Sequence, residues 1–175
     1  MKYQDCIEPA QAPDETADGE ARLAAANINP RTGLATDYLN HFNEAIMLLE
    51  ILAVCPDCRE DFLAWKPMSY REHFTASRFR ARETAISAYE AADPALRDCL
   101  DALAGTMTAM LEATRAAMKA GLPQDAAGAL AGHAAAWLKP LIARAGAVIN
   151  GETENNDGAA PQAAVDRLMK KLSSQ

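Results

Sequence analysis

Residues 94–120 carry the pattern that most limits how this chain can fold. Apolar or small side chains recur there in alternating steps of four and three, at Leu96, Leu100, Leu103, Met107, Met110, Thr114 and Ala117. This spacing puts them along one side of an α-helix, as in the seam of an antiparallel bundle. Asp93 and Pro94 are a typical helix start, and Gly121 followed by Pro123 is a typical end. A helix of this length needs other long helices to cover its apolar side.

Three further segments are expected to supply that cover, over residues 37–54, 70–92 and 125–149. Thr36 is placed to cap the first of them, and Ser69 forms a capping box with Glu72 at the start of the second. The inward positions are expected to be Leu39, Phe42, Ile46, Leu49 and Ala53 in the first segment, and Leu130, Ala134, Trp137, Leu141, Ala145 and Val148 in the last. Pro140 should kink the last helix. The sequence therefore predicts an all-α fold, an up-and-down four-helix bundle, with a short extra helix near residues 57–65.

Composition supports helices and limits the possible partners. Alanine, the best helix former, is abundant, whereas aromatic residues make up only 6% of the chain. The formal net charge is -7, which disfavours binding to nucleic acid or to an anionic membrane. No apolar stretch is long enough to span a bilayer, and the N-terminal residues lack the apolar core of a signal peptide. We expect a cytoplasmic protein with reduced cysteines.

The two ends of the chain differ from its middle. Residues 1–30 are polar and rich in proline and acidic side chains, which predicts a disordered arm before a bundle at 31–151. Residues 152–162 have the composition of a flexible linker. Residues 163–175 then predict a short amphipathic helix with Val165, Leu168, Met169 and Leu172 on one side. So short a helix needs a surface to fold on, either its own bundle or a partner's groove. Leu168, Met169 and Leu172 are therefore candidate partner-binding residues.

The stretch "CPDC" at residues 55–58 allows three interpretations. A redox pair opens a helix directly after a β-strand, but the sequence downstream predicts only helices. A zinc site needs two more ligands at suitable spacing, and Cys6, Cys99 and His73 are not closely paired with one another. A corner between two helices needs only Pro56 and Asp57 at a turn. We expect the corner, and no oxidoreductase activity.

A second set of residues could hold a transition metal such as zinc or iron. Asp37, His41 and Glu44 share one side of the helix predicted at 37–54, and carboxylate and imidazole groups are common metal ligands. With His73, Cys55 and Cys58 they form the candidate metal ligands of an alternative, metal- or cofactor-binding bundle. The paired Glu-x-x-His motifs of di-iron bundles are not present, however.

Charged and apolar stretches provide candidate contacts with another protein. Arg71, Arg78 and Arg82 are spaced by seven and four, which places them in one stripe of the helix predicted at 70–92. Such a stripe could bind an acidic segment or a phosphate, or it could pair within the molecule. The run "AIMLLEILAV" at 45–54 is apolar nearly all round, which favours a central helix or a homodimer contact. Its only charge, Glu50, should pair with an arginine or lie at an interface rim.

Two stretches resemble segments of small, uncharacterised helical proteins of alphaproteobacteria: "NPRTGLATDYLNHFNEAIMLLEIL" and "EDFLAWKPMSYREHF". The resemblance covers roughly residues 29–120 and implies a bacterial cytosolic setting, but no site. The features together predict a non-enzymatic protein that binds or regulates another protein. The metal- or cofactor-binding bundle is the alternative.

Overall fold

The computed structural model describes residues 15–55 and 58–152, and their regular elements are all helical. These elements are α1 (Glu15–Ala25), the 3₁₀ helix η1 (Thr36–Tyr38), α2 (Leu39–Val54), α3 (Arg59–Ala64), α4 (Tyr70–Ala76), α5 (Arg82–Ala91), α6 (Pro94–Lys119) and α7 (Gln124–Asn150). The all-α prediction is confirmed, as is the short helix expected near residues 57–65. The linker and helix predicted at 152–175 lie almost entirely outside the described residues.

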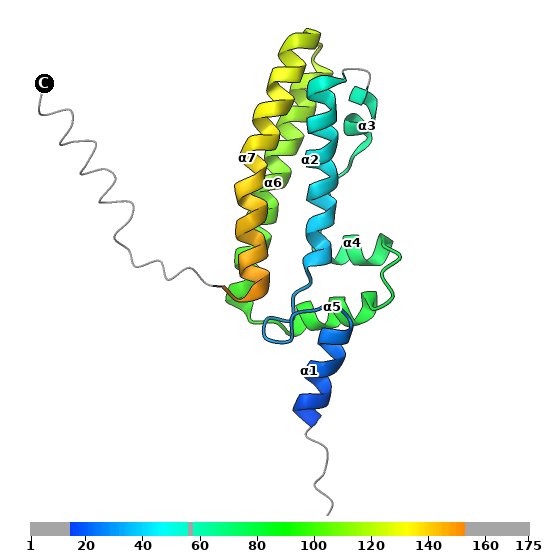
Figure 1. The fold of residues 1–175 in the computed structure, drawn as a ribbon, viewed down its shortest axis with the longest axis vertical. Helices are drawn as coiled ribbons and strands as arrows, with labels where there is room; N and C mark the ends of the chain where they lie inside the picture. Colours follow the sequence, from blue (N-terminus) through cyan, green and yellow to red (C-terminus); the bar gives the residue numbers. More distant parts are fainter. Residues whose placement is uncertain (1–14, 56–57, 153–175) are drawn as a thin grey trace, which may run out of the picture.

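The body of the molecule is a bundle of the three long helices α2, α6 and α7 (Figure 1). Gly146 of α7 faces the side chain of Leu39, and Gly128 faces the backbone of Ala53, so α7 runs antiparallel to α2. Gly121 has a positive φ of 88° in the turn that joins α6 to α7, as its position in the sequence predicts. The core lies between these helices and continues beneath α3 and α4.

The fourth long helix of the predicted bundle does not form. Residues 70–92 are divided into α4 and α5, which lie across the lower end of the bundle rather than along it (Figure 1). At the break Ser77 has an extended backbone, and its hydroxyl donates to the carbonyl of Phe74 and accepts from the N–H of Phe79. The Phe79 ring then packs against Phe74 at 5.3 Å. A serine that bonds to nearby backbone competes with helix, and here tertiary packing favours the break.

The buried side of α6 follows the predicted steps of four and three, but every second position is displaced by one residue, which rotates the buried side by about 50°. Its fully buried residues are Leu100, Ala104, Met107, Leu111, Thr114 and Met118. Three of them belong to the predicted seam, whereas Leu103 and Met110 are only partly buried. The Thr114 hydroxyl is satisfied by the carbonyl of Met110 in the preceding turn. The predicted period of the α6 seam is therefore correct, but the exact buried side is not.

Two of the predicted inward positions on the other long helices are wrong. Trp137 is 60% exposed, and the next residue, Leu138, is fully buried in its place. Ala53 is exposed, and Leu52 is buried instead. The inward side of α7 consists mainly of alanines, so its sequence scarcely distinguishes one side of the helix from another. Pro140 lies within α7, which continues to Asn150.

The predicted disordered arm is wrong for residues 15–30. Residues 15–25 form α1, and Ile28 is buried in the core just beyond it. The Thr32 hydroxyl donates to the carbonyl of Ile149 at 2.6 Å, which ties this segment to the last turn of α7. Gly33 has a φ of 69°, and a Cβ there would lie only 2.8 Å from the carbonyl oxygen of Ala88. Residues 26–35 therefore form a strap that packs on both α7 and α5.

The predicted helix caps are mostly confirmed. Ser69 and Glu72 form both bonds of the capping box, and the Asp93 carboxylate accepts from the N–H of Ala95. Thr36 is not a cap, because η1 precedes α2 and neither helix has a side-chain cap at its N-terminus. Asp37 instead bonds to Asn40 and His73. The Asp37 carboxylate therefore stabilises contacts with these two side chains and does not cap a helix.

Candidate functional site

The outward side of α2 exposes a row of large apolar side chains, which we call the α2 stripe. It consists of Met47, Ile51 and Val54, which are 52%, 37% and 83% exposed. Their spacing of four and three aligns them on one side of the helix, opposite buried residues such as Leu49 and Leu52. The prediction that "AIMLLEILAV" has more apolar surface than one core needs agrees with this arrangement.

Acidic side chains flank the α2 stripe. Glu50 is half exposed, and its carboxylate pairs with the ammonium group of Lys139 on α7 at 2.5 Å. This pair replaces the arginine partner that we expected. Glu44 lies on the exposed side of the same helix, and α2 contains no lysine or arginine. The exposed side of α2 is thus an apolar row with carboxylates beside it.

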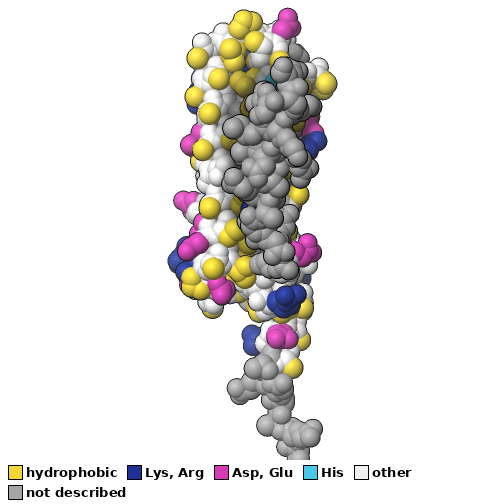
Figure 2. All heavy atoms as spheres, turned by 90° about the vertical axis from the view of Figure 1, so that its left-hand side faces the viewer, with side chains coloured by type: hydrophobic (Ala, Val, Ile, Leu, Met, Phe, Trp, Pro, Cys, Tyr) yellow, Lys and Arg dark blue, Asp and Glu magenta, His cyan; other side chains and the backbone are white. Residues whose placement is uncertain are grey.

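The neighbouring part of α7 is built from small residues. Gly132 has open space where a Cβ would be, and Gly128 lies close to the backbone of Ala53. Figure 2, which views the α7 side of the molecule, shows apolar side chains gathered near the upper end of the bundle, where α2 ends and α7 begins. The part of α7 close to the end of α2 is therefore built from small and apolar residues.

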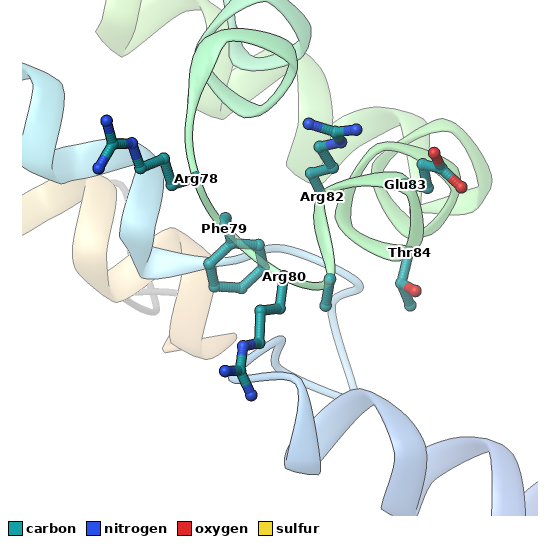
Figure 3. A pocket seen from close by; sticks show the side chains of 7 residues that line it. Arg78, Phe79, Arg80, Arg82, Glu83 and Thr84 are labelled. Atoms are coloured by element: carbon teal, nitrogen blue, oxygen red, sulfur yellow. The ribbon is translucent and has the colours of Figure 1, made fainter.

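The predicted arginine stripe is not formed, because the helix that would carry it is broken. Arg71 lies on α4 and pairs with Glu90 at 2.7 Å, whereas Arg78 lies in the loop and Arg82 begins α5. A cavity of about 370 Å³ is lined by residues 78–84. In Figure 3 the side chains of Arg78, Arg80 and Arg82 point in three different directions. They do not converge on a common anion.

Two of the three histidines, His41 of α2 and His73 of α4, lie close to each other. His73 Nε2 lies 3.1 Å from Asp37 Oδ2, and the rings of His73 and His41 are 6.1 Å apart. His41 is only 3% exposed, and neither of its ring nitrogens has a hydrogen-bond partner. Its ring stacks on Trp65 at 4.6 Å, and the Trp65 indole donates to the His41 carbonyl. Burial, helped by His73, lowers the pKa of His41 to about 4.

The candidate metal ligands are only partly brought together. Asp37, His41 and His73 lie close to one another, but Glu44 is exposed on the outer side of α2. Cys55 and Cys58 are at the far end of α2. Among the described residues there is no group of three or more histidine, cysteine or acidic side chains placed to hold a metal ion.

The two cysteines of "CPDC" stand at a corner between helices, as predicted. Cys55 ends α2, Cys58 precedes α3, and the N–H of Cys58 donates to the carbonyl of Cys55 at 3.1 Å. Both cysteines are partly buried and are not joined in a disulfide. The strand that a thioredoxin-like site requires before its cysteines is absent here, because α2 occupies that place.

Sequence reasoning missed a group of three tyrosines beside α6. Tyr70 stacks on Tyr89 at 4.3 Å and lies 5.1 Å from Tyr38. The Tyr89 hydroxyl donates to Asp101 at 2.6 Å, and the three rings border a cavity of about 410 Å³. Burial and this carboxylate raise the pKa of Tyr89. These rings come from separate elements, so no local spacing in the sequence signals the cluster.

Comparisons with models of protein families, with curated proteins and with solved structures find no match. In the part of the chain that the structure describes, no helix is both long and apolar enough to cross a membrane. The candidate partner-binding residues Leu168, Met169 and Leu172 lie outside the described residues.

Proposed function

We propose that this chain is a non-enzymatic protein of the bacterial cytosol that binds another protein through the α2 stripe. The observation that carries the proposal is the alignment of Met47, Ile51 and Val54 on the exposed side of α2. Apolar side chains scattered singly on a surface are normal, but a contiguous row of large ones is typical of an interaction site. The small residues of α7 nearby leave room for a partner's side chains.

The chemistry around the α2 stripe indicates what kind of partner would fit. A row of apolar residues at helical spacing is complementary to the apolar side of another amphipathic helix. Glu44, which is exposed beside the row, favours a partner whose helix has a basic residue at its flank, whereas Glu50 is already paired with Lys139. The partner is thus a protein with an exposed, basic amphipathic helix.

The reactive side chains of the fold are engaged in structural contacts, which supports a binding role over catalysis. His73 is paired with Asp37, Tyr89 with Asp101, and the aromatic ring of His41 is stacked within the core. The first two contacts help to hold α4 and α5 on the bundle, and the third packs the segment after α3 against α2.

The test is a comparative capture experiment with three forms of the full chain. Ile51→Asp puts a charge in the middle of the α2 stripe, and Thr106→Asp puts the same charge on an exposed position of α6 as a matched control. Proteins from bacterial lysate that bind the unaltered chain and the control, but not Ile51→Asp, would be partners at this surface. Their binding segments, mapped with synthetic peptides, should be basic amphipathic helices.

Capture that is equal for all three forms would refute the proposal. Thermal melts of the same samples show whether the variants are folded, and Ile51→Asp should melt close to the unaltered chain because Ile51 is already 37% exposed. If the captured protein is the chain itself, the interaction is the homodimer that the sequence predicts.

A further inference from the structure

The chain contains a candidate ligand for its own binding surface. Residues 153–175 follow the last turn of α7, which ends beside Thr32 at the lower end of the bundle. Their sequence places Val165, Leu168, Met169 and Leu172 on one side of a helix. This inference rests on the proposed function, because it assigns an occupant to the same α2 stripe.

The two apolar rows match in length. Val165 and Leu172 are separated by seven positions, and so are Met47 and Val54. At a rise of about 1.5 Å per residue, each row is about 10 Å long. A helix laid along α2 could therefore contact the whole α2 stripe without leaving a large apolar side chain of its own uncovered.

The length of the chain allows this contact. Gly128 lies level with Ala53 and Gly146 with Leu39, so Met47 is level with a position near the middle of α7. Along the axis it is about 20 Å from the end of α7, and Val54 is about 35 Å from it, at about 1.5 Å per residue. The polar residues 153–162 can span about 33 Å when extended. A helix at 163–173 can thus begin beside Met47 and end near Val54.

The charges also agree with this placement. Residues 163–173 contain Arg167, Lys170 and Lys171 against one acidic side chain, Asp166. The exposed side of α2 offers Glu44, and Glu50, whose carboxylate already pairs with Lys139 of α7, while α2 itself has no lysine or arginine. A second copy of α2 on the same row would instead bring no lysine or arginine of its own to pair with Glu44.

We propose that residues 163–173 dock as a helix on the α2 stripe of their own chain and cover it until a partner displaces them. Tethering makes this contact intramolecular, so even weak intrinsic affinity keeps the surface largely covered. A partner's helix must then compete with the segment, and the measured affinity is the intrinsic affinity multiplied by the fraction of chains in which the surface is uncovered.

The test is hydrogen exchange of the full-length chain, followed by mass spectrometry of peptides that cover residues 163–173. Leu168→Asp should make this segment exchange faster, by about tenfold, because its apolar side no longer docks. The decisive variant is Ile51→Asp, more than a hundred positions away in the sequence, which should speed exchange in 163–173 by a similar factor. Thr106→Asp is the control and should leave it unchanged.

Exchange in 163–173 that is the same in Ile51→Asp and in the unaltered chain would overturn the docking proposal. Partner capture separates this failure from that of the proposed function. If docking holds, Leu168→Asp should capture more partner than the unaltered chain. If exchange is insensitive to Ile51→Asp but capture is still lost, only the docking is wrong. If capture survives Ile51→Asp, the proposed function is wrong whatever the exchange shows.

Discussion

Acid should destabilise this fold through His41. The His41 ring is buried against Trp65, and its nitrogens make no hydrogen bond of good geometry; the nearby backbone of Lys66 favours the charged form, but burial outweighs it. His73, whose ring lies 6.1 Å away, also lowers the pKa of His41, and Asp37 is bonded to His73 rather than to His41. The imidazole is therefore neutral in the folded protein, with its pKa lowered from 6.5 to about 4.

The sign and size of the effect follow from proton linkage. Between pH 6.5 and pH 4 the unfolded chain binds a proton at His41 that the folded chain does not, so lower pH favours unfolding. The stability from a neutral His41 is complete above pH 6.5 and is lost as the pH falls. With about 1.4 kcal/mol per pKa unit, the loss between pH 7 and pH 5 is about 2 kcal/mol.

Urea denaturation at pH 7 and pH 5, followed by tryptophan fluorescence, measures this loss against His41→Leu. Leucine has a similar volume and does not titrate, and all other ionisable groups are common to the two proteins. We expect the unaltered chain to lose about 2 kcal/mol more than the variant between the two pH values. A packing change in the variant is the same at both pH values and cancels.

His133→Leu serves as the matched control. His133 is exposed on α7, where its ring lies 6.0 Å from that of Trp137, and its replacement should leave the pH dependence of the unaltered chain intact. Equal losses of stability for the unaltered chain and for His41→Leu would refute the reasoning. They would mean that the His41 ring is hydrated or finds a partner when it is protonated.

Two other predictions concern the strap and the "CPDC" corner. Ile28→Ala should lower the free energy of unfolding by about 2–4 kcal/mol, because Ile28 is 1% exposed in the core. The same substitution at exposed Val54 should change it little, and equal urea midpoints for the two variants would show that the strap does not pack. Replacing Cys55 and Cys58 together with serine should preserve the helical circular dichroism spectrum, and the unaltered chain should not speed insulin reduction by dithiothreitol. Insulin reduction above the rate without protein would contradict the corner interpretation.

Local signals in the sequence predicted individual helices well and their assembly less well. The capping box at Ser69, the Asp93–Pro94 start and the Gly121 end depend on neighbouring residues, so each could be found from spacing alone. The break at Ser77 could not, because it depends on Phe79 reaching Phe74 in the folded molecule. The strap was missed for a similar reason. Its few apolar residues lie in a polar stretch, and only the folded bundle provides their contacts.

The candidate site, too, could be predicted where it depends on local sequence and could not where it depends on tertiary contacts. The excess apolar surface of "AIMLLEILAV" was readable from the sequence and corresponds to the α2 stripe. The arginine row depended on a continuous helix over 70–92 and was lost with it. The burial of the His41 ring could not be predicted from the sequence, because its neighbours Asn40 and Phe42 give no indication of which distant groups, such as Trp65, surround it.

The bond between the Thr32 hydroxyl and the Ile149 carbonyl has a consequence for synthesis of the protein on the ribosome. The strap cannot pack on α7 until the last turn of α7 has been translated and has left the exit tunnel. Until then, Ile28 and Leu34, which are both fully buried in the finished fold, lack the complete surface on which they pack. Contacts between such distant parts of a chain also slow folding. Nascent chains halted before residue 149 should therefore be good clients of ribosome-associated chaperones.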